Sequence, residues 1–205
     1  MAHSSLLVPL INDILKQNRV GADQLDAIAV SKGPGSYTGL RIGVSTAKGM
    51  AYATKNKLIA VNTLQALASG VMHSPAFSAL NKTNSIDLLC PMIDARRMEV
   101  YSAVYTTDNE LYKEVSAEII TTGSYVSLLD HHKVLFFGNG ARKCIESIRH
   151  PNAFFLDGIE TSARFMVPLS AALFHSGSFE NVAYFEPFYL KDFVPTTPKN
   201  KILPG

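Results

Sequence analysis

Apolar residues recur at helical spacing from the first residues of the chain. On a helical wheel of roughly 100° per residue, they fill an arc of about 200°. The residues of this arc are Leu6, Leu7, Val8, Leu10, Ile11, Ile14 and Leu15. A helix that packs against one core needs a stripe nearer to about 100° wide. We therefore predict a helix that is capped by Ser4 or Ser5, ends near Asn18, and is either enclosed in a core or docked on a partner chain.

The segments that follow alternate between strand and helix patterns. Residues 26–31 are short, apolar and β-branched, which predicts a strand, and a glycine turn then leads into a helix over residues 38–54. Residues 58–61 predict a second, parallel strand, and Asn62 is a suitable cap for a helix that starts at Thr63. Strand, glycine turn and helix together form the opening of a βαβ unit.

The strand and helix pattern restarts after a polar stretch at residues 73–85, which we take as the junction between two halves. Later strands are predicted at residues 86–93, 99–105, 110–120 and 134–137, with helices at 124–129, around Cys144 and at 162–174. The proline-rich tail from Glu186 predicts extended, irregular structure. This order favours an α/β fold with mixed sheets and two units, residues 1–84 and 85–205.

The composition is that of a globular protein and excludes a wholly disordered or fibrous chain. The 205 residues are 47% hydrophobic and 18% charged, and the net charge is +2, too small to predict nucleic-acid binding by itself. Cys90 and Cys144 are far apart and form neither a CxxC pair nor a disulfide framework. With no apolar run of membrane-spanning length and no secretory signal, we expect a soluble, cytoplasmic protein.

The glycine turn after the first predicted strand is the strongest local feature. Gly33 and Gly35 permit close approach of a ligand or of another backbone, and Ser36 and Arg41 border the start of the next helix, where unpaired N–H groups favour phosphate. The spacing is GxGxxxG, which is found more often in a tight strand-to-helix turn than in a nucleotide cradle. Three further residues that end predicted strands are weaker candidates for a place near a nucleotide: Asp94, Gly138 and Gly140.

Small residues line one side of the helix predicted at residues 38–54. Gly39 and Gly43 are four residues apart, and Ala47 and Ala51 continue the same side. A smooth strip of this kind permits close packing against another helix or against the sheet of the same domain.

No pattern for catalysis or for metal binding is found. The six histidines include no pair at i and i+4, and no serine is framed by a GxSxG elbow. We therefore assign no catalytic and no metal-binding residue.

The run at residues 31–49, SKGPGSYTGLRIGVSTAKG, resembles the TsaB (YeaZ) family. The resemblance continues at residues 58–64, 91–97 and 188–191 and so spans nearly the whole chain. It implies an actin-like fold of two βαβ-containing halves. It also implies a non-catalytic subunit in the synthesis of threonylcarbamoyladenosine at position 37 of tRNA. Family members begin with two or three strands before the first helix, so the resemblance implies a first half without its opening strands.

The resemblance also implies the partners. They are a TsaD-like catalytic subunit, a TsaE-like ATPase and a second copy of the chain, whereas tRNA is reached only through the complex and no membrane is involved. Family dimers use the first two helices of the N-terminal half. The interface residues expected here are Leu7, Leu10, Ile11, Ile14, Gly39, Gly43, Ala47 and Met50.

Nucleotide binding stays open at this point. ATP or ADP at a subunit interface is compatible with the resemblance. The alternative function is an actin-like small-molecule kinase or ATPase that uses the turn at residues 33–39.

Overall fold

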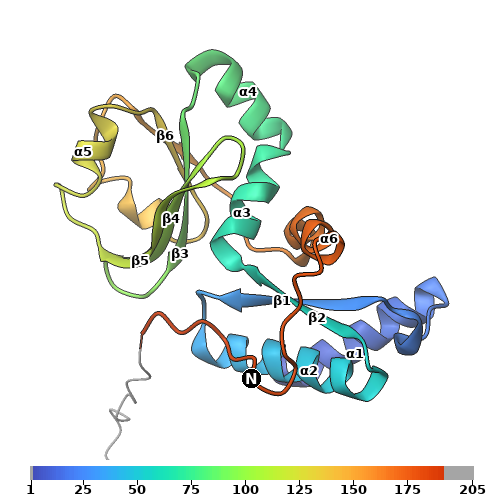
Figure 1. The fold of residues 1–205 in the computed structure, drawn as a ribbon. Coiled ribbons are helices and arrows are strands. Elements are labelled where there is room, and N and C mark those ends of the chain that lie inside the picture. The colour runs from blue at the N-terminus through green and yellow to red at the C-terminus, as the bar shows by residue number, and fades with distance from the viewer. Residues whose placement is uncertain (1, 192–205) are drawn as a thin grey trace, which may run out of the picture.

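A computed structural model describes residues 2–191, with side chains from Leu6 onward, and builds them around two β-sheets (Figure 1). The first sheet contains β1 (Ala27–Gly33) and β2 (Lys57–Asn62), which are parallel, with Ile28 opposite Leu58. The helix α2 (Tyr37–Thr54) connects the two strands. This is the βαβ unit that the sequence predicts, and within the described chain β1 has a strand neighbour on one edge only.

Both faces of the first sheet are covered. The helix α2 packs Val44, Ala47 and Ala51 against Val30 and Leu58. On the opposite face the 3-10 turn η3 (Ala163–Met166) and the helix α6 (Val167–His175) contribute apolar side chains, namely Phe165, Met166, Leu169 and Leu173. A parallel pair of strands needs such cover because its strands are apolar on both faces.

The first helix, α1 (Ala2–Asn18), begins before Ser4 and Ser5, so the prediction that one of these serines caps it is wrong. The helix ends at Asn18, as predicted. A 3-10 turn, η1 (Ala22–Gln24), leads from it to β1. No residue of α1 belongs to any of the four hydrophobic clusters formed by the described residues. The helix lies beside α2 at the margin of the molecule.

The second sheet has five strands in the order β5-β4-β3-β6-β7. Their bounds are β3 (Leu88–Asp94), β4 (Glu99–Thr106), β5 (Leu111–Ile119), β6 (Val134–Phe137) and β7 (Ala153–Leu156). The first three are antiparallel neighbours, while β3, β6 and β7 run parallel, so the sheet is mixed as predicted. The strand β7 is not among those predicted from the sequence.

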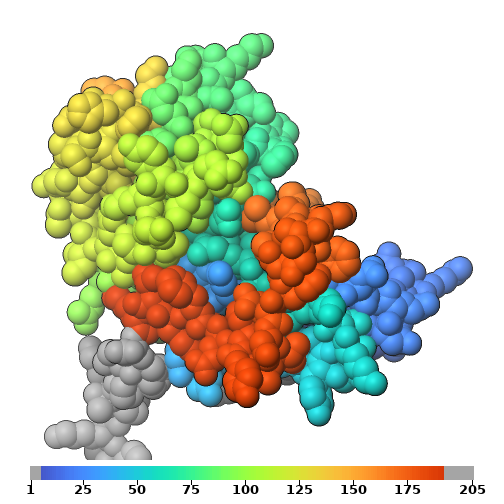
Figure 2. All heavy atoms as spheres, in the orientation of Figure 1, coloured from blue at the N-terminus to red at the C-terminus, as the bar shows by residue number. Residues whose placement is uncertain are grey.

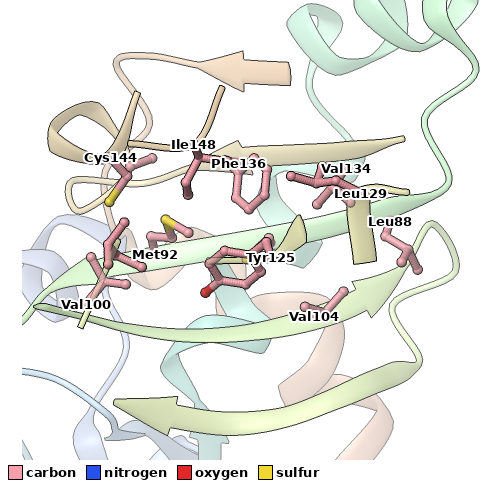
Figure 3. Close-up of a cluster of buried hydrophobic side chains, with 13 residues drawn as sticks. Leu88, Met92, Val100, Val104, Tyr125, Leu129, Val134, Phe136, Cys144 and Ile148 are labelled. Carbon is pink, nitrogen blue, oxygen red and sulfur yellow. The ribbon is translucent and has the colours of Figure 1, made fainter. Parts of the chain in front are cut away.

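The second sheet separates two cores. On one face Met92, Val100, Tyr125 and Phe136 converge beneath α5 (Val126–Leu129) and the 3-10 turn η2 (Arg142–Cys144), as Figure 3 shows. The opposite face is covered by α3 (Thr63–Met72) and α4 (Pro75–Asn84), which contribute the buried side chains Leu64, Leu67, Val71 and Phe77. As predicted, Asn62 caps α3, accepting hydrogen bonds from the N–H groups of Leu64 and Gln65.

Three predicted segments differ from the structure. The polar stretch at residues 73–85 contains the helix α4, which begins after Ser74 because this side chain accepts a hydrogen bond from the N–H of Phe77. The helix predicted around Cys144 is a single 3-10 turn, and that predicted at residues 162–174 is divided into η3 and α6. The tail has neither helix nor strand over residues 186–191, and its residues 192–205 lie outside the described chain.

Candidate partner interface and nucleotide-proximal turns

The apolar side chains of α1 face solvent on most sides of the helix. Leu6, Val8, Leu10 and Ile14 are each more than half exposed, and Ile14 reaches 59%. Leu7, Ile11 and Leu15 are half-buried, and from Leu6 to Asn18 the helix has no buried residue. In Figure 2 blue residues from the end of α1 and the following turn project from the side of the molecule. Of the two interpretations left open by the sequence, enclosure in the chain's own core is therefore wrong.

The predicted interface residues of α2 do not all lie on its surface. Gly39 is exposed and Met50 is half-buried, but Ala47 is 6% exposed and packs inside the first sheet's core. A Cβ atom on Gly43 would lie 3.9 Å from the Val30 side chain, so this glycine faces the same sheet. The expectation that Ala47 belongs to a partner interface is wrong, because the small-residue strip brings α2 close to its own strands.

The tail segment fills the space beside Gly33. The N–H of Phe188 donates to the carbonyl of Lys32, with N and O 2.7 Å apart. A Cβ atom on Gly33 would stand 2.6 Å from the carbonyl oxygen of Phe188, and the backbone there has φ +116°. Gly33 therefore allows the close approach of another stretch of this chain, which accounts for the glycine without a phosphate.

Side chains at the start of α2 meet the tail from the opposite side. The Tyr37 and Tyr189 rings lie 4.9 Å apart between centroids, and Arg41 lies over the Tyr37 ring while its Nη1 donates to the Tyr37 hydroxyl. The Nζ of Lys48 donates to the carbonyls of Ala183 and Phe185. These residues border an open cavity of about 370 Å³. Gly35 and the cap residue Ser36 precede this group.

A second group of predicted residues meets where β3 and β6 end. The side-chain oxygen of Asn139 accepts the N–H of Asp94, 2.9 Å away, and a Cβ atom on Gly140 would stand 3.0 Å from that nitrogen. Gly138 has φ +97°, and a Cβ atom there would overlap the Met92 carbonyl oxygen at 2.4 Å. Here too the glycines accommodate backbone of the same chain rather than leaving room for a ligand.

Asp94 accepts a hydrogen bond from a lysine that was not predicted from the sequence to lie near it. Its carboxylate pairs with Lys143, whose Nζ also donates to the carbonyls of Arg97 and Glu99, both at 2.7 Å. Partial burial of Asp94 raises its pKa, but the hydrogen bonds from Lys143 and from the N–H of Arg96 outweigh that cost and hold the pKa below its usual range. The carboxylate is therefore a fixed structural anion.

A partly open pocket of about 230 Å³ lies between the first sheet and η3. Its walls carry the hydroxyls of Ser31 and Thr63, whose oxygens are 2.5 Å apart, and the apolar side chains of Leu67, Phe165 and Met166. No charged residue lines this pocket among the described residues. A triphosphate needs cations or several free N–H groups, whereas the polar side chains of these walls are the hydroxyls of Ser31, Thr63, Thr161 and Ser162.

The predicted nucleotide-proximal residues thus form two sets, one at the turn before α2 and one at the ends of β3 and β6. The tail connects the sets, because Lys191 pairs with Glu99 on β4 while Phe188 bonds to β1. Sequence reasoning missed Tyr189, Lys143 and Lys191 because their partners lie far away along the chain. The repeated aromatic residues of the tail were the available signal for Tyr189.

Over residues 2–191, no three side chains of histidine, cysteine, aspartate and glutamate come together in a way that could hold a metal ion. Within the same residues, no helix has the length and apolar character needed to span a membrane.

The fold identifies the class of protein to which the chain belongs. The structure is similar to a Pseudomonas aeruginosa protein described as uncharacterized with similarity to the peptidase YeaZ, with a TM-score of 0.75, 23% identity, and coverage of 92% of this chain and 84% of that chain. It is similar to YeaZ from Pseudomonas aeruginosa with a TM-score of 0.70, 22% identity, and coverage of 93% and 86%. At these identities the likeness shows the fold alone, which is the predicted α/β, actin-like fold; of its two sheets, the second is mixed as predicted.

The family model described as "TsaD: tRNA N6-adenosine threonylcarbamoyltransferase" matches residues 1–197, and the chain belongs to this family. Within it the chain is similar to the tRNA threonylcarbamoyladenosine biosynthesis protein TsaB of Escherichia coli, 28% identical over 99% of this chain and 85% of that protein. The TsaB of Bacillus subtilis is 35% identical over 55% of this chain and 44% of its own length. The resemblance to the TsaB (YeaZ) family is confirmed.

Proposed function

We propose that this chain is a non-catalytic subunit in the synthesis of threonylcarbamoyladenosine at position 37 of tRNA, and that it docks a TsaD-like catalytic subunit through α1 and the exposed side of α2. The names of the TsaB relatives in Escherichia coli and Bacillus subtilis support this pathway. The observation that carries the docking role is the exposure of α1, in which Leu10 and Ile14 are 56% and 59% exposed. An isolated helix of this length is marginal in water, so a partner that covers its apolar side stabilises it.

The exposed side of α2 extends the proposed docking surface. Tyr52 is 82% exposed, and Met50 and Ile42 are half-buried on a helix that lies beside α1. A surface that joins aromatic, methionine and branched aliphatic side chains is typical of the centre of a protein–protein interface.

The docking role is tested with the double variant L10E/I14E. Docking would bury the two new glutamate carboxylates without partners, so the variant should not capture the purified TsaD-like subunit in a pull-down. Its far-UV circular dichroism should equal that of the unaltered chain. The matched control is L111E/I119E on β5, which changes two side chains that are 47% and 72% exposed outside the docking surface. Capture by L10E/I14E equal to that by the control would exclude this surface.

We propose two further partners, a second copy of the chain that uses the same surface and a TsaE-like ATPase that joins the assembled subunits. A homodimer and the complex with the TsaD-like subunit compete for α1, so L10E/I14E should be monomeric by light scattering. The TsaE-like ATPase should be retained only when both other subunits are present. Retention by this chain by itself would contradict that order of assembly.

The alternative function, a kinase or ATPase, is tested by isothermal titration of the isolated chain with ATP and magnesium. The pocket walls and the filled glycine turns give a triphosphate few partners, so we expect no turnover. Tight binding with turnover would favour the enzyme.

A further inference from the structure

The turn between β3 and β4 presents two adjacent arginines to solvent. Arg96 and Arg97 are both exposed and both have left-handed backbone, with φ of 72° and 49°. The turn is closed by hydrogen bonds from the N–H of Ala95 to the carbonyl of Glu99 and from the N–H of Glu99 to the carbonyl of Arg96. Because the turn is fixed at both ends, the two guanidinium groups emerge from a rigid support.

The carboxylates nearby are already occupied by lysines. Asp94 pairs with Lys143 and Glu99 pairs with Lys191. Among the described residues, Arg96 and Arg97 form no ion pair, and neither does the exposed Arg142 beside Lys143. The charge of Arg96 also helps to lower the pKa of Asp94, but without an ion pair, so the three guanidinium groups can still pair with an outside anion.

An aromatic pair and a further arginine continue this basic surface. The tail carries Lys191 next to the turn and Tyr189 two residues earlier, stacked on Tyr37 beside Arg41. Figure 2 shows the red tail lying against the yellow-green residues of the second sheet. The carboxylate of Glu186 borders the same cavity as Tyr189, and Tyr189 keeps 38% of its surface exposed. Cations that alternate with exposed aromatic rings suit an RNA chain, whose phosphates pair with arginine and whose unstacked bases lie on aromatic rings.

We propose that the surface formed by Arg96, Arg97, Arg142, Lys191 and the Tyr37–Tyr189 pair, here called the arginine–tyrosine surface, binds RNA directly, with the arginines on phosphates and Tyr189 under an unpaired base. The choice of RNA over another polyanion rests on the proposed function. The small net charge of the whole chain favours tRNA contact only through the complex. Net charge does not describe local charge, however, and this surface gathers arginines whose neighbouring carboxylates, Asp94 and Glu99, already pair with lysines.

The arginine contribution is tested by fluorescence anisotropy of the full chain with a labelled tRNA transcript at several salt concentrations. The variant R96Q/R97Q/R142Q should bind at least about tenfold more weakly, and the slope of log K against log salt should fall by about 2, since each lost phosphate contact removes about 0.7–0.9. The control K16Q/R19Q/R164Q removes three positive charges outside this surface, so its affinity for the transcript and its salt slope should equal those of the unaltered chain. Equal losses in the two variants, or no loss in either, would overturn the proposal.

The aromatic contribution has a different signature. Tyr189→Ala should weaken binding of a single-stranded oligouridine by about tenfold at an unchanged salt slope, because stacking releases no counterions. Tyr184→Ala is the matched control, since Tyr184 lies in the same tail and is 84% exposed. An affinity of the Tyr189 variant equal to that of this control would overturn the base-stacking role.

Two further measurements separate RNA from other partners and this proposal from the proposed function. If R96Q/R97Q/R142Q loses binding to vesicles of phosphatidylcholine and phosphatidylserine while tRNA binding is unchanged, the surface recognises lipid and the proposal fails. The variant L10E/I14E should bind the transcript as the unaltered chain does. Intact subunit capture by L10E/I14E would contradict the docking role alone, whereas loss of transcript binding by R96Q/R97Q/R142Q with intact subunit capture is expected only if the arginine–tyrosine surface is separate from the docking surface; equal transcript binding by R96Q/R97Q/R142Q and the unaltered chain would contradict the RNA proposal alone.

Discussion

The core of the second sheet and the helix α1 are built from the same kinds of residue and bury them to opposite extents. Phe136 of β6 is fully buried in the core of the second sheet, whereas Ile14 of α1 is 59% exposed. Both segments are strongly apolar in the sequence. Apolar content alone therefore does not tell whether the chain itself buries a segment. That depends on which other elements the fold packs against it.

The largest expected effect tests this contrast directly. Phe136→Ala removes a ring that packs between Tyr125 and Phe155, and the cavity should lower the free energy of unfolding by about 3–5 kcal/mol. Ile14→Ala removes a solvent-facing group and should change it by no more than about 0.5 kcal/mol. Urea unfolding of the isolated chain measures both, and similar losses would mean that α1 is part of the core.

An intermediate effect is expected from two glycines that differ in their surroundings. Gly138→Ala should lower the unfolding free energy by about 2–4 kcal/mol, because a left-handed backbone cost of about 1–2 kcal/mol adds to the overlap with the Met92 carbonyl. Gly158→Ala has a similar φ, +74°, but nothing within 4 Å of the new Cβ atom, so only the backbone cost remains. Thermal unfolding of both variants isolates the packing contribution, and equal losses would refute it.

The smallest effect concerns the half-exposed pair of Asp94 and Lys143. The pKa of Asp94 is lowered in the folded state, so its contribution to stability is present above the unfolded pKa of about 3.9 and is lost as the pH falls through the lower folded value. Asp94→Asn should therefore reduce stability near neutral pH and approach the unaltered chain in acid. Asp108→Asn, in an exposed hairpin loop, serves as the control. A constant gap between Asp94→Asn and the unaltered chain at all pH values would contradict the assignment.

Local chemistry accounts for what the sequence could predict. The βαβ unit follows from β-branched alternation, and the cap of α3 follows from the side chain of Asn62, which bonds within its own turn. The apolar arc of α1 predicted the helix but left open whether the chain's own core encloses it. All of these depend on residues close together in the chain.

The remaining features depend on contacts between distant residues. Gly33 carries the same turn signal whether a phosphate or the Phe188 carbonyl stands beside it, and 155 positions separate the two residues. Likewise, the helical spacing of Ala47 does not tell a partner helix from the chain's own strands. Lys143 and Lys191 are ordinary surface lysines in the sequence, and only the fold places them on Asp94 and Glu99.

The path of the tail has a consequence for synthesis on the ribosome. The cluster around Val30 and Leu58 takes in Val182 and Phe185, and Lys32 receives its hydrogen bond from Phe188. The first sheet is thus translated early but acquires these neighbours after nearly the whole polypeptide has emerged. Until then the nascent chain exposes apolar strand and helix surface, which makes that interval the one in which a chaperone has most to shield.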